Sequence, residues 1–148
     1  MKILIIGNSA AGTAAIEAIR KEDKACSIVQ LSDEPHMLYS RCLLSYYLGG
    51  TLDRDAIAFR EEDFHREMNV QLHAGSGYRA VALVPDKRRV TCENGESYDY
   101  DRLLIATGAS AKLPGNIPKG INGVFVLRNL TDVEAIKLKV EEARQAVV

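Results

Sequence analysis

Two glycines near the amino terminus have the spacing of a loop that binds a diphosphate group. The segment Gly7-Asn8-Ser9-Ala10-Ala11-Gly12 follows the pattern G-x-G-x-x-G, except that Ser9 occupies the position of the middle glycine. In this pattern the first glycine allows a sharp turn from strand to helix, and the last allows the helix to lie close to the sheet. Ser9 is small and its hydroxyl can donate to an oxygen, so the loop still predicts an anion site.

Two acids stand where a ribose-binding carboxylate is expected. Asp33 and Glu34 follow Gly12 by about 20 residues, the usual distance in dinucleotide-binding folds. A degenerate glycine pattern by itself also occurs in strand-to-helix turns that bind no ligand. The order of glycine turn, helix and acid favours a dinucleotide site.

The residues around the glycine loop predict the elements that would position it. Residues 2–6 and 27–31 are apolar and rich in β-branched side chains, as in parallel strands that are covered on both faces. Residues 13–20 between them are strong helix formers. Residues 103–106 predict a central parallel strand, whose end at Thr107-Gly108 would face the same ligand.

The middle of the chain predicts a second, different sheet. Residues 69–73 still resemble a short parallel strand, but residues 78–100 alternate in polarity and contain turn sequences. That pattern indicates an antiparallel meander. The predicted fold is therefore a three-layer α/β, Rossmann-like nucleotide-binding fold with a parallel sheet and an antiparallel β-meander.

The remaining segments predict short elements. Residues 35–50 indicate a loop and a short apolar helix closed by glycine, and residues 53–67 a surface helix or two short turns. Residues 109–122 contain proline and glycine without periodicity, which is typical of a linker. A short strand is expected at residues 123–127.

The last part of the sequence predicts a helix over residues 131–148, with Thr131 or Asp132 as its N-cap. Residues 145–148 resemble the beginning of another buried strand. On this pattern we expect the sequence to be part of a larger protein.

Composition argues against several kinds of partner. The formal net charge is −1 over 148 residues, which gives no basic surface for nucleic acid. No apolar run reaches the length of a membrane span, so no membrane partner is expected. The amino terminus lacks the features of an export signal, which predicts a cytoplasmic location.

The cysteines and histidines do not form a recognisable metal or disulfide pattern. The three cysteines are widely spaced and odd in number, and the three histidines lack ligand spacing. No metal is therefore expected. The residues concerned are Cys26, Cys42, Cys92, His36, His65 and His73.

Four segments, taken in order, resemble the pyridine nucleotide-disulfide oxidoreductases, a family of flavoproteins with two dinucleotide folds. The first two are the glycine loop and the acid pair, and the third is Tyr39-Ser40-Arg41. The fourth is Tyr98-Asp99-Tyr100-Asp101-Arg102-Leu103-Leu104-Ile105-Ala106-Thr107-Gly108-Ala109, which is similar to the family's second FAD signature. In that family the first fold binds FAD, and a second fold inserted after it binds NAD(P)H.

The resemblance implies a division of the chain and a function. Residues 1–110 would form the FAD-binding Rossmann-like domain. Residues 111–148 would supply a linker, a short strand and a helix leading to an NAD(P)H-binding domain that the chain lacks. The implied function is the FAD-binding portion of an oxidoreductase that passes electrons from NAD(P)H through FAD to an acceptor. The acceptor, a small molecule or a redox protein, is left open, as is a homodimer of the full-length protein.

The resemblance also assigns residues to the two halves of FAD. The residues between Gly7 and Gly12 would lie against the pyrophosphate, and Asp33 or Glu34 would bind the adenosine ribose. Backbone groups of Ala80 or Val81 in the meander would meet adenine. The flavin half would be approached by Arg41, Cys42 and the turn Ala106-Thr107-Gly108.

Cys42 stands between two branches of the family. Tyr39-Ser40-Arg41 with Leu44-Ser45 is similar to the ferredoxin-reductase and nitrite-reductase-like branch, which usually has proline at the position of Cys42. The glycine loop, and a cysteine eight residues before Gly50, are similar instead to NADH oxidases and coenzyme A-disulfide reductases. In those proteins the matching cysteine is the redox-active thiol, and Arg41 beside it would favour a thiolate. The alternative, that Cys42 is a small packed residue, stands equally.

A function of another class also stays open. The chain could be a nucleotide-binding module that holds NAD or ADP without flavin or catalysis, because a fold alone does not define an activity. The second signature over residues 104–109 and the meander before it argue against such a module, which needs neither.

Overall fold

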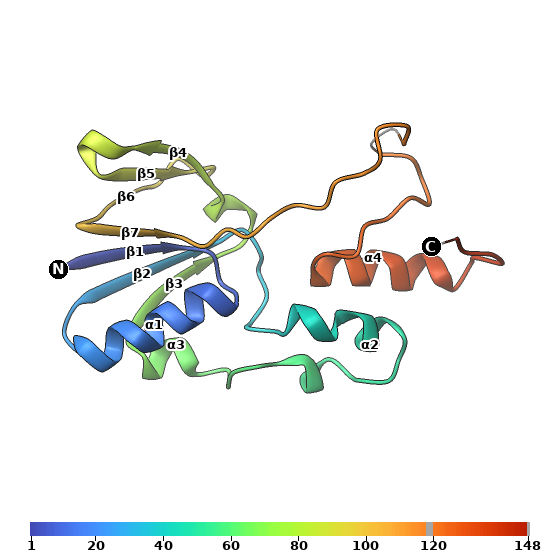
Figure 1. Ribbon diagram of the computed structural model, residues 1–148, viewed down its shortest axis with the longest axis horizontal. Helices are drawn as coiled ribbons and strands as arrows, with labels where there is room; N and C mark the ends of the chain where they lie inside the picture. Colours follow the sequence, from blue (N-terminus) through green and yellow to red (C-terminus); the bar gives the residue numbers. More distant parts are fainter. Residues whose placement is uncertain (118–119, 148) are drawn as a thin grey trace. The chain divides into compact units, whose positions relative to one another are not determined.

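The computed structural model describes residues 1–117 and 120–147 (Figure 1). They form two compact units, which we treat separately. The sheet unit consists of residues 1–39 and 59–108. The helical unit consists of residues 40–58 and the described residues from 109 onward.

A parallel sheet of four strands, in the order β3-β2-β1-β7, forms the centre of the sheet unit. The predicted parallel strands are confirmed to within one residue at each end. However, β7 lies at the edge of this sheet among the described residues, so the prediction of a central strand is wrong. An apolar run indicates that the faces of a strand are covered, not that it has two neighbours. The strands are β1 Lys2–Ile6, β2 Ser27–Ser32, β3 Val70–Ala74 and β7 Arg102–Ile105.

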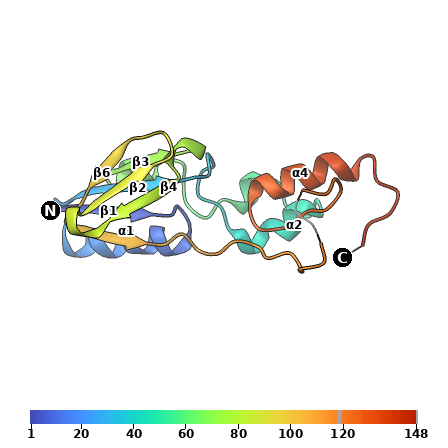
Figure 2. The same cartoon turned by 90° about the horizontal axis from the view of Figure 1, so that it is seen from above.

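Different layers cover the two faces of this sheet, as Figures 1 and 2 show. Helices lie on one face, and an antiparallel meander of order β4-β5-β6 lies on the other. The three-layer α/β fold with a meander is therefore confirmed. The helices are α1 Ala10–Glu22 and α3 Phe64–Glu67; the meander is β4 Ala80–Val84, β5 Arg89–Cys92 and β6 Ser97–Asp99, with the 3-10 turns η3 Ser76–Tyr78 and η4 Pro85–Lys87.

Alternate residues of β1 point to opposite faces, so the unit has two apolar cores. Ile3 and Ile5 pack with Ile16 of α1 and Phe64 of α3 in the first core. Leu4 belongs to the second, whose buried members are Leu4, Leu31, Val90 and Cys92. The continuous apolar sequence of β1 thus reflects burial on both sides.

Arg20 fixes the end of α1 to the turn that leads into β3. Its guanidinium donates to the carbonyl oxygens of Met68 at 2.6 Å and Asn69 at 2.9 Å. It also donates to those of Asp23 at 3.2 Å and Cys26 at 3.0 Å. One side chain therefore satisfies four backbone acceptors from two segments distant in sequence.

The helical unit is built from short helices. The short apolar helix predicted before Gly49 is confirmed as η1 and α2. Residues 53–67 form two short turns, one in each unit. The predicted alternative of two short turns is therefore confirmed, and that of a single surface helix is wrong. The elements are η1 Arg41–Leu43, α2 Leu44–Leu48, η2 Asp55–Ile57 and α4 Leu130–Val140.

Three predictions for the end of the chain are wrong. Residues 123–127 form no strand; Phe125 and Leu127 are exposed, and an apolar run without a pairing partner does not make a strand. The helix ends at Val140, and the exposed residues 145–147 form no strand; residue 148 lies outside the described residues.

The N-cap of α4 is Asn129, and neither Thr131 nor Asp132. The Asn129 side chain accepts from the N–H of Asp132 at 2.8 Å, and the Asp132 carboxylate accepts from the N–H of Asn129 at 3.0 Å. This reciprocal capping box satisfies two backbone donors at once, which fixes the start of the helix earlier than predicted.

Candidate functional site

The glycine loop between β1 and α1 begins with a backbone that favours glycine. Gly7 has a φ of +122°, and a Cβ at this position would lie 2.2 Å from the carbonyl oxygen of Ala106. The N–H of Ala106 in turn donates to the carbonyl oxygen of Ile6 at 2.8 Å. The ends of β1 and β7 are therefore side by side at this loop, as the sequence predicts.

Gly12 allows the first turns of α1 to approach the loop. A Cβ on Gly12 would lie 2.2 Å from the carbonyl oxygen of Gly7 and 2.9 Å from Nε2 of Gln30. The close approach expected for the last glycine of the pattern is thus present. Its immediate neighbours are the loop's own carbonyl and a side chain of β2.

The first turn of α1 presents backbone donors without a side-chain cap. Ser9 is the N-cap in an extended conformation, and within the described residues its hydroxyl makes no capping hydrogen bond. Ala10 and Ala11 are exposed. The first N–H groups of a helix have no partner within it, and the helix dipole makes this end positive. The end of a 13-residue helix such as α1 is suited to an anion.

Asn8 carries a polar group that the protein leaves unsatisfied. Its Oδ1 is buried and has no hydrogen-bond partner among the described residues. The amide can accept from a hydroxyl at Oδ1, and after a rotation of 180° it can donate from Nδ2 to an anion. A ligand with phosphate or hydroxyl oxygens at this loop would satisfy it.

The turn after β7 faces the same loop. Thr107 and Gly108 are exposed, and Gly108 has a φ of +69°. The Thr107 nitrogen would lie 3.3 Å from a Cβ on Gly7. The structure thus brings together the loop residues from Gly7 to Gly12 and the turn Ala106-Thr107-Gly108.

The two acids after β2 differ in their surroundings. Asp33 is exposed, whereas the Glu34 carboxylate accepts a hydrogen bond from the Tyr39 hydroxyl. The N–H of Glu34 donates to the Ser32 hydroxyl at 3.2 Å. The hydrogen bonds of Glu34 therefore stabilise the connection after β2, whereas Asp33 is the acid that is accessible to a ligand.

The predicted adenine contacts lie at an irregularity in the meander. Ala80 pairs with Cys92 and Ala82 with Thr91, so Val81 is the extra residue of a β-bulge. A bulge leaves the backbone groups of the extra residue outside the ladder. Val81 is also 58% exposed, so the bulge lies at the surface of the meander.

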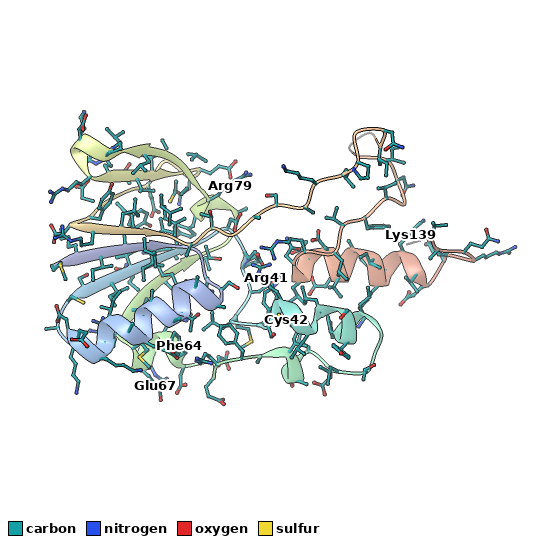
Figure 3. The ribbon with its side chains drawn as sticks, in the orientation of Figure 1. Arg41, Cys42, Phe64, Glu67, Arg79 and Lys139 are labelled. Carbon is teal, nitrogen blue, oxygen red and sulfur yellow. The ribbon has the colours of Figure 1, made fainter. Side chains whose placement is uncertain are left out.

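Arg41 and Cys42 belong to the helical unit and are labelled in Figure 3. The Arg41 guanidinium donates to the carbonyl oxygen of Arg128 at 3.2 Å, which ties η1 to the segment before α4. Cys42 is exposed, whereas Cys26 and Cys92 are buried. These two predicted site residues therefore belong to the other unit, and their contact with the flavin half stays a prediction.

Two residues beside the loop were not predicted from the sequence. Gln30 in β2 is fully buried, and its Nε2 donates to the carbonyl oxygen of Gly7 at 2.8 Å. Its Oε1 lies 2.9 Å from Nε2 of His65, and burial lowers the pKa of that histidine. The sequence signal that could have indicated Gln30 is its position as a polar residue inside the apolar run Ile28-Val29-Gln30-Leu31.

The described residues contain neither a cluster of metal-binding side chains nor a helix that could span a membrane. No group of three or more His, Cys, Asp or Glu residues within the described ranges could hold a metal ion. Among these residues, no helix has the length and apolar character needed to traverse a bilayer.

The chain as a whole is similar to known proteins of one family. A family model for pyridine nucleotide-disulphide oxidoreductases matches residues 1–148. The NADH-dependent phenylglyoxylate dehydrogenase subunit epsilon of Aromatoleum evansii is 36% identical and aligns with 99% of this chain. An NADH oxidase of Methanocaldococcus jannaschii is 32% identical over 96% of the chain.

A solved structure shows the same fold. The NAD-dependent persulfide reductase from A. fulgidus superposes with a TM-score of 0.86 over 97% of this chain, at 28% identity. The alignments cover 34% of the A. evansii protein, 33% of the M. jannaschii protein and 28% of the A. fulgidus chain. This chain thus spans about a third of the length of such relatives, and it belongs to the pyridine nucleotide-disulphide oxidoreductase family.

Proposed function

We propose that this chain is the FAD-binding portion of an NAD(P)H-dependent flavoprotein oxidoreductase. FAD, when bound, supplies redox chemistry by accepting reducing equivalents from NAD(P)H and passing electrons to an acceptor. One observation carries the proposal: the ends of β1 and β7 meet at the first turn of α1, where the buried Oδ1 of Asn8 has no hydrogen-bond partner among the described residues.

The residues of the loop fit a dinucleotide. We assign the pyrophosphate to the backbone N–H groups of the α1 first turn, with the Asn8 amide and the Ser9 hydroxyl as further donors. The two glycines leave no room for side chains between loop, helix and β7, so the backbone itself meets the ligand. The donors are those of Asn8, Ser9, Ala10 and Ala11, held between Gly7 and Gly12.

Asp33 is the better candidate for the adenosine ribose. Its carboxylate is exposed at the end of β2, while that of Glu34 already accepts from Tyr39. A carboxylate there can accept from ribose hydroxyls. For adenine, the backbone of Val81, which has no partner in the register of the ladder, is favoured over that of Ala80, which is paired.

The Asp33 assignment can be tested by substitution. We expect Asp33→Ala to weaken FAD binding by about 1.5 to 3 kcal/mol, the contribution of a hydrogen bond to a charged group. The exposed Asp86 of η4 provides the matched control, Asp86→Ala, which should leave the affinity unchanged. Equal affinities of both variants and the wild type, measured by titration calorimetry, would remove Asp33 from the site.

The flavin half is assigned to Thr107, Gly108, Arg41 and Cys42 by similarity to the family, and the role of Cys42 separates two forms of the proposal. In one form Cys42 is a redox-active thiol, as in NADH oxidases and disulfide reductases. In the other the flavin alone passes electrons on, as in ferredoxin reductases. Its exposure is compatible with a reactive thiol.

The Cys42 question needs the full-length enzyme. We propose to compare Cys42→Ser with the wild type, following NADH consumption with oxygen, a disulfide and a one-electron acceptor. Activity lost only with the disulfide, or peroxide formed from oxygen in place of water, supports the redox thiol. Unchanged rates with every acceptor support the flavin-only form. Cys26→Ser and Cys92→Ser test buried cysteines as controls.

We further propose the division of the chain implied by the resemblance: residues 1–110 as the FAD domain, and residues 111–148 as the connection to an NAD(P)H-binding domain. The isolated 148 residues should then consume no NADH even with added FAD. The cytoplasmic location and the homodimer of the full-length protein stay predictions, and the acceptor is a small molecule or a redox protein.

The optical spectrum of the protein tests the proposed function directly. After incubation with FAD and removal of unbound ligand, the chain should retain the flavin absorption bands. A colourless protein that still binds ADP or NAD would favour the non-catalytic nucleotide-binding module instead. A heat-denatured sample taken through the same steps is the control, because any FAD that it retains is not bound by the folded protein.

A further inference from the structure

Gln30 is an unusual residue for its position. It lies in β2 between apolar neighbours, and its exposed fraction is 0%. An amide moved from water into an apolar interior destabilises the fold unless its polar atoms are hydrogen-bonded. The contacts of Gln30 therefore need a physical explanation.

Both ends of the Gln30 amide have a partner. Nε2 donates to the carbonyl oxygen of Gly7 at 2.8 Å, and Oε1 lies 2.9 Å from Nε2 of His65. Because the carbonyl of Gly7 can only accept, Nε2 must face it and Oε1 must face His65. His65 must therefore carry its proton on Nε2, which makes it the donor in a chain from His65 through Gln30 to Gly7.

The carbonyl that Gln30 holds belongs to the glycine loop. The peptide bond from Gly7 to Asn8 is trans, since the described residues contain no cis peptide. In a planar trans peptide the C=O and the N–H point in opposite directions. With the Gly7 oxygen held towards Gln30 and Gly12, the N–H of Asn8 is turned to the opposite side of the peptide.

We propose that Gln30 is a positioning residue of the nucleotide site, and that His65 holds Gln30 in place. Gln30 keeps the partial negative charge of the Gly7 carbonyl away from the phosphates and aims the Asn8 N–H at them. This inference rests on the proposed function, because it concerns the same loop. Neither residue touches the ligand.

Two substitutions separate the hydrogen bond from the volume of the side chain. Gln30→Glu keeps the shape and the acceptor for His65, but when ionised it has no donor for Gly7, so its effect is measured above the pKa that burial raises. Gln30→Met keeps the approximate volume and loses both bonds. We expect each to weaken the binding of FAD and of ADP about tenfold, the effect of one hydrogen bond. His65→Phe should weaken binding by a smaller factor, because it acts through Gln30.

The matched controls are Gln71→Glu and Gln71→Met, since Gln71 is an exposed glutamine on the neighbouring strand β3. They should leave both affinities unchanged. Hydrogen exchange of the Asn8 amide gives a readout that does not involve the ligand: it should change in the Gln30 variants and not in the Gln71 variants.

The outcomes distinguish a failure of the inference about Gln30 from a failure of the proposed function. A purely structural role of Gln30 would lower the unfolding free energy while the folded protein kept its affinity and its Asn8 exchange rate, which would overturn the inference alone. If a Gln30 variant fails to fold, His65→Phe provides the test with the same measurements. Absence of FAD and ADP binding by the wild type would overturn the proposed function, and the inference with it.

Discussion

The glycines of the loop after β1 and those of the segment between β7 and α4 lie in opposite environments. A Cβ on Gly7 or Gly12 would lie 2.2 Å from a backbone oxygen. A Cβ on Gly115, Gly120 or Gly123 would meet nothing within 4 Å. Glycine in the first segment permits a close approach of backbones, whereas in the second it only permits turns. Glycine content therefore does not separate a binding loop from a linker, but the surrounding contacts do.

The largest test of this difference is a pair of valine substitutions. Gly12→Val places side-chain atoms against the Gly7 carbonyl and should lower the unfolding free energy by about 3 kcal/mol and abolish nucleotide binding. Gly115→Val meets open space and should change the unfolding free energy by less than about 0.5 kcal/mol. Urea denaturation measures both, and equal effects would show that the close approach at Gly12 has no energetic importance.

The backbone bonds of Arg20 provide the next test, in the sheet unit. Arg20→Met keeps much of the apolar stem but leaves the four carbonyl oxygens without their donor. We expect a loss of about 2 kcal/mol in unfolding free energy, as for a hydrogen-bonded charged group. Lys21→Met, at an exposed neighbouring position, is the control. If Arg20→Met lowers the unfolding free energy no more than Lys21→Met does, water satisfies the four carbonyl oxygens as well as the guanidinium does.

Within the helical unit we expect a smaller effect from the capping box of α4. Asn129→Ala removes the side chain that accepts from the Asp132 N–H and should lower the unfolding free energy by about 1 kcal/mol. Asn129→Asp retains an acceptor and should restore most of it. Circular dichroism during urea denaturation follows the loss of helix, and an unchanged midpoint in the alanine variant would contradict the assignment of the cap.

The smallest effect is expected at the ion pair between Arg54 and Glu134, also in the helical unit. The charged atoms are 2.6 Å apart, but the side chains are 39% and 44% exposed. Because water and salt screen exposed pairs, Arg54→Met should lower the unfolding free energy by about 0.5 kcal/mol or less. A loss comparable to that of Arg20→Met would show that the two units do not differ in this respect. The comparison should be repeated at high salt.

The same contrast explains how much the sequence could predict. In the sheet unit, apolar runs such as Ile3 to Ile6 are strong local signals, and the parallel strands agree with the prediction to within one residue. In the helical unit the apolar run around Phe125 pairs with no strand among the described residues. Strand formation depends on a partner, which no local pattern reveals.

The candidate site, too, could be predicted from the sequence only in part. The glycine loop and the acid pair Asp33-Glu34 are predicted from spacing alone. Gln30 and His65 are 35 residues apart in sequence, and only folding brings them together beside the Gly7 carbonyl that Gln30 binds. The difference between Asp33 and Glu34 likewise depends on Tyr39, whose hydroxyl is committed to Glu34 in three dimensions.

The central claim is that the loop of the sheet unit holds the pyrophosphate and adenosine of FAD. Its most direct test is a fluorescence titration of this chain with FAD, followed by competition with ADP and with FMN. We predict that FAD binds, that ADP displaces it because both share the adenosine diphosphate half, and that FMN displaces it poorly. Displacement by FMN but not by ADP, or no binding of FAD, would contradict the account.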